Sequence, residues 1–504
     1  RFYARAAGEY AAMQYANADA VKYLGRALEI TPEADVQARF EISETLIEVL
    51  DFQGMRAEHL ALLHNADTYA EQLNTAQQGI IAAWWARYYF LTGEYESSIA
   101  AGEKAIRLAA AAGDGETEIK TRVTVSMSLF YLRRFADARP HHDAALAVMR
   151  RDGLFAKEAS ILNSMGSSAF EQDDFAGAMR YHGEALAAAE RAGSLNDQND
   201  ALNGLAIASY RHQLVKEGEQ YILRALEVCR KTGNRRSLAR NLNNLSNIYA
   251  DQFDYRRTLE CLLEAVRIEE TVSAVRGEVI ARNNLGFTYQ ELGRLNDARE
   301  QFERMVQLCQ SSLAIQFGTS ARCSLARVHY YLGDFDRAAE ILASFDLAAL
   351  DQEYPQRAVE VPFILARIAL ARGDFQRALE LFTIAAPQAA RSDNPLFTPI
   401  VTIALAYARD RLGEPRDDGQ TVAFENALAL LLPADDPQFF DFDLWALLRA
   451  ADLVRAADPD RARTIIQRTA ELIEARSAKI PDDELRAEYH DHHPMHAEVF
   501  AANA

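Results

Sequence analysis

Residues 241–268 read NLNNLSNIYADQFDYRRTLECLLEAVRI, and residues 281–306 read ARNNLGFTYQELGRLNDAREQFERMV. The two segments share a pattern at a spacing of forty residues, because Tyr289 occupies the position of Tyr249 and Phe302 occupies that of Leu262. A fixed period between 20 and 50 residues is typical of a solenoid built from repeated units. Each segment is therefore expected to form one repeat, made of a first helix A and a second helix B.

A column of small residues continues the period in both directions. Small residues seven positions apart lie two turns apart on one helix face, so they allow helix A and helix B of a repeat to approach closely. Steps of forty from Ala298 reach Ser98, Ala138, Ala178, Gly218, Thr258, Ala338 and Ala378. Seven positions after each of these eight stand Ala105, Ala145, Ala185, Ala225, Ala265, Met305, Phe345 and Ala385.

Two further kinds of column mark where the helices end. Glycine supplies the positive φ that ends a helix, so it is expected at the turn after helix A and again after helix B. A large residue three positions before the small column fills the gap beside the first turn. The large column is Tyr95, Phe135, Phe175, Val215, Tyr255, Leu295, Phe335 and Phe375, and the glycines are Gly93, Gly293, Gly333 and Gly373, then Gly113, Gly153, Gly193 and Gly233.

These columns resemble the tetratricopeptide repeat (TPR). Its pattern is matched by Leu285-Gly286, Tyr289, Ala298 and Phe302, with Met305 in the last alanine place. The repeats are forty residues long and not the common 34, which lengthens both helices and the outer link. This longer form resembles the TPR arrays of large bacterial regulators and of kinesin light chains. The resemblance implies an all-α fold, a right-handed α-solenoid superhelix of antiparallel helix pairs whose concave face is lined by helix A.

The regularity of the repeats divides the chain into four parts. Residues 1–83 hold two divergent repeats, and residues 84–390 hold the regular array. Residues 391–480 are interrupted by Pro395, Pro399 and Pro415 and are expected to form divergent helical repeats. The polar tail, residues 481–504, is expected to cap the last repeat, since the ends of a solenoid must keep their apolar faces from water.

Composition narrows the function classes. The chain has 504 residues and a net charge of −19, which argues against a general surface for nucleic acids or anionic membranes. One basic cluster is expected to be a solvated loop. It contains Arg230, Lys231, Arg235, Arg236 and Arg240.

Sequence motifs give no sign of catalysis or export. There is no P-loop, GxSxG, HExxH or dinucleotide-binding fingerprint, no apolar run near 18 residues and no signal peptide. The four cysteines form no CxxC and are expected to be reduced core thiols. The sequence thus predicts a cytoplasmic, non-catalytic binding scaffold without a cofactor. The cysteines are Cys229, Cys261, Cys309 and Cys323.

Asparagines on helix A are the main candidate ligand-binding residues. Asparagine in a helix interior costs about 0.5–0.7 kcal/mol relative to alanine, so its recurrence needs a reason. One hypothesis is a ladder of amides that hydrogen-bonds the backbone of an extended peptide, as in TPR peptide receptors and cargo adaptors. The other is that the amides bond between repeats and fix helix stacking. The candidates are Asn163, Asn203, Asn243 and Asn283 in one column, Asn244 and Asn284 in the next, and Asn247 one turn further.

Arginines and histidines give two weaker candidates. Arginines on or near the helix A surface are expected either to receive acidic or phosphate groups or to pair with surface carboxylates. Histidines in the tail resemble zinc ligands, but no second cluster completes a coordination shell, which favours a cap without metal. The arginines are Arg240, Arg282, Arg322, Arg327 and Arg367, and the histidines are His490, His492, His493 and His496.

The two ends of the chain resemble a family of larger proteins. Residues 2–30, FYARAAGEYAAMQYANADAVKYLGRALEI, are similar to the start of the TPR region in signal-transduction ATPases with numerous domains (STAND), and residues 486–500, RAEYHDHHPMHAEVF, are like the ends of such arrays. The resemblance, which extends to maltose-regulator-like transcription activators, implies an ATPase upstream of Arg1 and no catalytic residue within this chain. It predicts a sensor or regulatory arm that binds an inducer or a protein partner. A free-standing adaptor that grips a peptide is the alternative, and an enzyme using the histidine tail is a third hypothesis.

Overall fold

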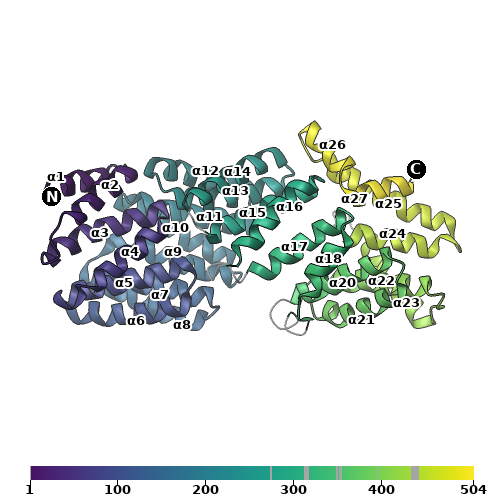
Figure 1. Cartoon of the computed structure of the whole chain (residues 1–504), viewed down its shortest axis with the longest axis horizontal. Helices are drawn as coiled ribbons and strands as arrows, with labels where there is room; N and C mark the ends of the chain where they lie inside the picture. Colours follow the sequence, from purple (N-terminus) through teal and green to yellow (C-terminus); the bar gives the residue numbers. More distant parts are fainter. Residues whose placement is uncertain are drawn as a thin grey trace. The chain divides into compact units, whose positions relative to one another are not determined.

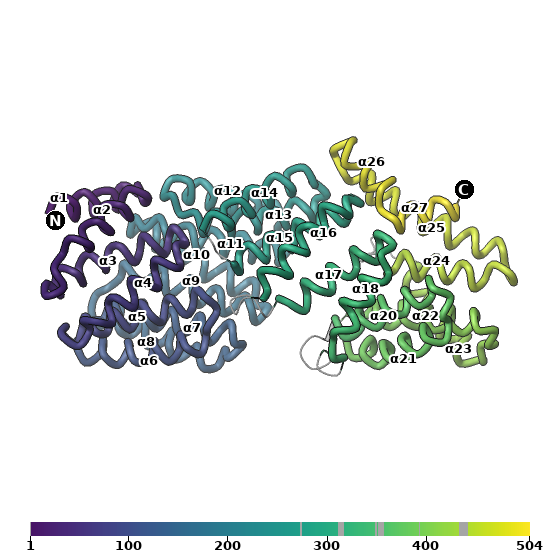
Figure 2. Tube along the Cα trace, viewed as in Figure 1, coloured from purple at the N-terminus to yellow at the C-terminus, as the bar shows by residue number. Residues whose placement is uncertain are grey.

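The computed structural model describes residues 2–272, 275–310, 317–347, 350, 355–392, 394–432 and 442–503, without the side chains of residues 355 and 356. These ranges contain helices and no β-strand. Helices follow one another as antiparallel pairs stacked along the chain (Figures 1 and 2). The expected all-α, TPR-like solenoid is confirmed.

Seven helix pairs and the A helix of an eighth occupy the first part of the chain. In each pair the first helix is helix A and the second is helix B. They are α1 (Phe2–Met13) and α2 (Asn17–Glu29), α3 (Val36–Gln53) and α4 (Arg56–Asp67), α5 (Thr75–Thr92) and α6 (Tyr95–Ala112), α7 (Gly115–Tyr131) and α8 (Phe135–Asp152), α9 (Glu158–Glu171) and α10 (Phe175–Ala192), α11 (Leu195–Arg211) and α12 (Val215–Thr232), α13 (Arg235–Asp251) and α14 (Tyr255–Thr271), then α15 (Val275–Glu291).

The pairs continue to the end of the described chain. A last short hairpin, α26 and α27, follows the final pair. The helices are α16 (Leu295–Leu308), α17 (Gly318–Tyr331) and α18 (Phe335–Ala343), α20 (Pro355–Ala371) and α21 (Phe375–Arg391), α22 (Phe397–Arg411) and α23 (Asp418–Leu431), α24 (Phe442–Arg455) and α25 (Pro459–Ser477), α26 (Asp483–Asp491) and α27 (Pro494–Asn503). None of the helices in the described ranges is long and apolar enough to cross a membrane.

Packing divides the chain into two compact units. Unit 1 contains residues 1–248 and 260–281, and unit 2 contains residues 249–259 and 282–504. The units exchange segments, since the start of α14 packs with unit 2 and the rest of α14 with unit 1. This division follows packing and not repeat regularity, so the four-part division at residues 84, 391 and 481 stays a prediction.

The predicted columns explain how each pair packs. The large column supplies the first residue of all eight B helices from α6 to α21. All eight members of the small column are buried, and Ala105, Ala145, Ala185, Ala225 and Ala265 have no exposed surface. The second column, seven positions after the first, fails in one repeat. There α18 ends at Ala343, and Phe345 lies beyond the helix, half-buried.

The turn between helix A and helix B keeps one backbone conformation even where glycine is missing. Gly93 has φ = 83° and Gly293 has φ = 72°, as expected for residues that end helix A. Four repeats between them place a larger residue at the same position, with φ between 58° and 66°: Arg133, Asp173, Gln213 and Phe253. The period therefore fixes the turn geometry, and glycine only makes it easier to reach.

Candidate ligand-binding face

Helix α13 carries a polar stripe along one of its faces. Arg236, Arg240, Asn244 and Asn247 recur every three or four residues, which places them on one face of the helix. Arg236 and Asn244 are half-buried, whereas Arg240 and Asn247 are exposed. We call these four residues the α13 stripe. It contains three of the residues that the sequence predicted as ligand-binding.

Arg240 reaches the neighbouring A helix. Its Nη2 lies 2.8 Å from Oδ1 of Asp200 on α11, and both side chains stay about half exposed, at 48% and 52%. Burial would lower the pKa of Arg240, but Asp200 outweighs burial and the pKa is raised. Arg240 therefore extends from α13 toward α11, the A helix of the preceding repeat. Arg240 lies within α13 and not in the solvated loop expected for its basic cluster, which agrees with its other prediction, as a residue of helix A.

A second ion pair indicates which helices lie on the inner side of the curve. Lys120 on α7 lies 4.0 Å from Glu48 on α3 and 3.1 Å from Glu116. Helices α3 and α7 belong to repeats that are not adjacent, so this contact spans the inner side of the curve. Helix A therefore lines the concave side in this part of unit 1, as the TPR resemblance implies.

The asparagine ladder bonds between helices where it is buried. Asn203 is 9% exposed, and its Oδ1 accepts a hydrogen bond from Nδ2 of Asn244 at 2.8 Å, which joins α11 to α13. Asn163 donates from Nδ2 to the carbonyl of Asp197 at 3.2 Å and pairs its Oδ1 with Nδ1 of His182 at 3.1 Å. These bonds fit the stacking hypothesis for Asn163 and Asn203. Asn243 is half-buried and Asn247 is exposed.

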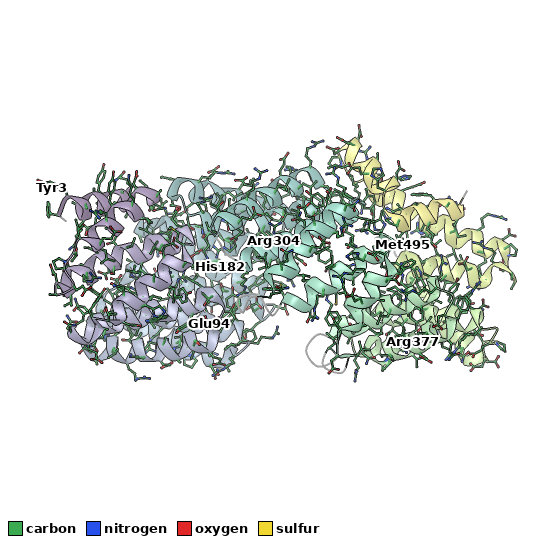
Figure 3. All side chains as sticks on the ribbon, in the orientation of Figure 1. Tyr3, Glu94, His182, Arg304, Arg377 and Met495 are labelled. Atoms are coloured by element: carbon green, nitrogen blue, oxygen red, sulfur yellow. The ribbon has the colours of Figure 1, made fainter. Side chains whose placement is uncertain are left out.

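Two buried histidines also make polar contacts within the array, and the sequence did not single them out. His182, labelled in Figure 3, packs so closely on two glycines that a Cβ added to Gly166 or Gly204 would lie 2.7 Å or 2.4 Å from its ring. Burial lowers the pKa of His182 to about 4. His142 bonds Oγ of Ser164 at 2.8 Å, and burial lowers its pKa to about 4 as well. Their signal in the sequence is a shared position, 160 and 120 residues before Phe302.

Side chains five repeats apart close unit 1 on itself. Asp51 at the end of α3 contacts Arg236 of the α13 stripe at 3.2 Å, and also Arg87 and Arg56, both at 3.1 Å. Burial would raise the pKa of Asp51, but Arg87, Arg236 and Arg56 outweigh it and hold the pKa well below its usual range. One end of the α13 stripe is thus part of the closure, and Asn247 at the other end is exposed.

Two more contacts extend this closure. The Nδ2 of Asn17 on α2 donates to the carbonyl of Thr232 on α12 at 3.4 Å. Arg276 on α15 donates to the hydroxyl of Tyr95 and lies over the ring of Tyr131, 5.1 Å from its centroid. The first repeats of unit 1 are therefore tied to its last ones by polar contacts.

The remaining candidates lie in unit 2. Asn283 donates from Nδ2 to Oδ1 of its neighbour Asn284 at 3.3 Å. Arg367 is 3% exposed, lies over the rings of four aromatic residues and contacts Sδ of Met495 at 3.5 Å. Arg327 is 5% exposed and lies over the ring of Phe287 at 5.1 Å.

The C-terminal tail forms a hairpin against unit 2. Glu488 on α26 accepts two hydrogen bonds from Arg294, at 2.6 and 2.8 Å, and Asp482 pairs with Arg256. Figure 3 labels Met495 on the second helix of this hairpin, the residue that contacts Arg367. The hairpin thus reaches well beyond the last repeat that it was expected to cap.

The histidines of the tail take part in packing. His490 stacks on Phe500 with ring centroids 4.2 Å apart, and the rings of His493 and His496 lie 4.5 Å apart. His492 is exposed. No group of three metal-ligating side chains gathers anywhere in the described ranges. The four cysteines are buried and form no disulfide, as expected.

Comparison with known proteins supports the repeat assignment. The family model described as tetratricopeptide repeat matches residues 159–192, 238–274 and 280–313. The first match covers the α9–α10 pair, and the other two cover α13 to α16. No curated protein sequence matches the chain.

The chain is also similar to several solved structures. A Rap protein complexed with competence and sporulation factor is 12% identical, with a TM-score of 0.50 over 72% of this chain and 99% of that chain. The apo quorum sensor NprR from B. thuringiensis is 11% identical, with a TM-score of 0.47 over 77% of this chain and 99% of that chain.

A STAND protein with a tetratricopeptide repeat sensor, from Pyrococcus horikoshii, is also similar. It is 15% identical, with a TM-score of 0.44 over 74% of this chain, and the match spans 52% of that protein. At these identities, the similarity of the Rap protein shows the fold alone.

Proposed function

Because the chain is an array of tetratricopeptide repeats, we propose that it is a non-catalytic scaffold whose concave helix A face binds an extended peptide segment of a partner protein or effector. The α13 stripe carries this proposal. Its exposed members, Arg240 and Asn247, present a guanidinium and an amide group at the surface of α13. Side-chain amides both donate and accept, so they match the peptide backbone without reading its sequence.

The same stripe supports a sensor role. Arg236 holds the closure to Asp51, and Arg240 and Asn244 lie one and two helical turns further along α13. A ligand that binds Arg240 and Asn244 competes with Asp200 and Asn203 for them, and this changes how α13 packs on α11. Binding would then bias the closed turn of unit 1, as a sensor requires. The Rap protein of the same fold was solved in complex with competence and sporulation factor.

We further propose that this scaffold is the sensor arm of a larger signal-transduction ATPase or transcriptional regulator. The similarity of residues 2–30 to the start of STAND arrays supports it. The alternative is a free-standing adaptor with the same binding face. The reading frame upstream of Arg1 separates the two. A P-loop ATPase joined without a break supports the sensor arm, and a start codon directly before Arg1 supports the adaptor.

Peptide selection tests the binding face. A library of random twelve-residue peptides is selected against the full chain, and the best peptide is labelled for fluorescence anisotropy. Changing Asn244 and Asn247 together to alanine is expected to weaken its binding about 5- to 150-fold, since each lost hydrogen bond is worth about 0.5–1.5 kcal/mol. Asn163→Ala is the matched control. It is expected to lower the melting temperature and leave the Kd unchanged, because Asn163 bonds only within the array.

Two results would contradict the proposal. If the double variant binds as tightly as the parent chain but melts earlier, these amides serve helix stacking alone. If no selected peptide binds the parent chain above background, the concave face does not recognise extended peptides.

A further inference from the structure

Three buried polar groups without partners meet at the seam between α15 and α17. Arg327 is 5% exposed, and its Nε and Nη2 are enclosed and make no hydrogen bond within the described chain. The same holds for Oγ of Ser324, which has no exposed surface, and for Oδ1 of Asn283. Buried polar groups are nearly always satisfied, so three in one place need an explanation.

Helix geometry brings these groups together. Asn283 and Phe287 are four residues apart on α15, and Ser324 and Arg327 are three apart on α17, so each pair shares one helix face. The guanidinium of Arg327 lies over the ring of Phe287, 5.1 Å from its centroid, which joins the two faces. We call Asn283, Ser324 and Arg327 the α15–α17 seam.

The α15–α17 seam lacks a hydrogen bond that the same two asparagine columns form in unit 1. Asn203 and Asn244, 41 residues apart, bond each other at 2.8 Å in unit 1. Asn283 and Ser324 are also 41 residues apart and stand in the same two columns, but no bond joins them. The shorter serine leaves an acceptor on α15 and a hydroxyl on α17 open, with Arg327 one turn beyond.

The charge of Arg327 is not balanced within the described chain. No carboxylate lies within ion-pair distance of it there, and the ring of Phe287 compensates only part of the cost of burying a cation. Two other arginines of unit 2 have compensation of a kind that Arg327 lacks, since the half-buried Arg357 pairs with Glu360 and the buried Arg367 lies over four aromatic rings. Arg327 thus lowers the stability of unit 2 unless a ligand supplies the missing anion.

We propose that the α15–α17 seam binds an acidic residue of a peptide. The side-chain carboxylate accepts hydrogen bonds from Nε and Nη2 of Arg327 and from the hydroxyl of Ser324, and a backbone N–H of the same residue donates to Oδ1 of Asn283. The half-buried Asn283 and Phe287 mark the side of the seam that is nearest to solvent. This inference rests on the proposed function and adds the chemistry of one peptide side chain to it.

The test uses the full chain and three small probes at equal ionic strength. N-acetyl-glutamate methylamide offers both the carboxylate and the N–H, acetate offers only the carboxylate, and N-acetyl-glutamine methylamide lacks the charge. The glutamate probe is expected to raise the unfolding midpoint of unit 2 by about 2 °C and to slow hydrogen exchange of α15 and α17. Acetate is expected to act more weakly, and the glutamine probe not at all.

Replacing Arg327 is expected to stabilise the chain in the absence of ligand, whereas an ordinary core substitution destabilises it. Without ligand, Arg327→Met is expected to raise the midpoint by about 2–4 °C, because it replaces an unpaired buried charge with an apolar side chain of similar length. It is also expected to abolish the response to the glutamate probe. Arg322→Met is the control on the same helix. Arg322 donates to Oγ of Ser344, so its replacement should not raise the midpoint and should leave the probe response intact.

Three outcomes would overturn the inference. They are a lower midpoint for Arg327→Met than for Arg322→Met, equal shifts from the glutamate and glutamine probes, or a response to acetate as large as that to the glutamate probe. The last would assign the seam to a free carboxylate. Each leaves peptide binding at the α13 stripe untouched, because that test depends on residues of unit 1.

Discussion

His142 and His182 stand at a core position that Leu262 and Phe302 fill in later repeats. Both histidines are buried and neutral, with pKa values of about 4 against 6.5 for a free histidine. Below pH 6.5 these histidines are therefore protonated in the unfolded chain but still neutral in the folded chain. Each histidine then lowers the free energy of unfolding by about 1.4 kcal/mol per pH unit down to about pH 4. Glu269 opposes this, since burial raises its pKa to about 7.

The substitution His142→Leu removes the contribution of one histidine to this pH dependence of stability. Leucine suits the position, as in Leu262, and Ser164 keeps its bond to Ser126 at 2.9 Å. The variant is expected to lose about 1.4 kcal/mol less stability per pH unit than the parent between pH 6.5 and 4.5. Urea unfolding followed by the fluorescence of Trp84 and Trp85 measures this slope. An unchanged slope would mean that His142 is already protonated in the folded chain.

Gln213 holds the positive φ of a helix A turn, at 66°, that glycine adopts elsewhere. A non-glycine residue in this region costs about 1–2 kcal/mol, and glycine loses more entropy on folding by about 0.5–1 kcal/mol. Gln213→Gly is therefore expected to stabilise unit 1 by about 0.5–1 kcal/mol. Gln213→Ala removes the same exposed side chain without relieving the backbone, so it should not stabilise. A loss of stability in the glycine variant would show that the strain is absent.

At the scale of helices, the sequence predicted the array well because the residues that begin and end each helix lie within the same repeat. Small, large and glycine columns at a spacing of forty residues were enough to place the start of each B helix from α6 to α21. They did not predict that Arg133 or Gln213 would adopt the glycine conformation, because the neighbouring repeats and not these residues set that turn. Asn163 and Arg240 were correctly placed on helix A. Their partners could not be read from the sequence, since those depend on how adjacent repeats stack.

The C-terminal hairpin depends on an ion pair that local rules did not reveal. The side chains of Arg294 and Glu488 are 31% and 17% exposed, so their two hydrogen bonds are partly shielded from water. Glu488→Arg places two cations in contact and is expected to speed hydrogen exchange in α26 and α27 several-fold. Adding Arg294→Glu should restore protection by reversing the pair. Glu484→Arg, on the exposed side of the same helix, is the control. Equal exchange in Glu488→Arg and the control would show that apolar contacts alone hold the hairpin.

Within each compact unit, the superhelix brings together repeats that are far apart in the sequence. In unit 1, Asn17 meets Thr232, and in unit 2 the ring of Phe253 lies 5.1 Å from Nζ of Lys479. These contacts join repeats five positions apart in both units. They result from many small rotations between neighbouring repeats, so no single motif predicts them, and a ligand that alters the stacking of one pair acts on the whole turn.

Asp51→Asn tests this closure in unit 1. The carboxylate of Asp51 pairs with three arginines, and the side chain of Asp51 is 13% exposed. Removing the negative charge therefore leaves three partly buried cations close together. Breaking such a buried pair from one side costs about 3–5 kcal/mol, and the partial exposure of Arg87 and Arg236 favours the lower end. Hydrogen exchange is expected to rise both around Asp51 and in residues 232–236, far away in the sequence. Glu190→Gln breaks an exposed pair with Arg224 and should cost at most about 1 kcal/mol. If Asp51→Asn behaves like this control, apolar packing closes the turn and the α13 stripe has no electrostatic link to it.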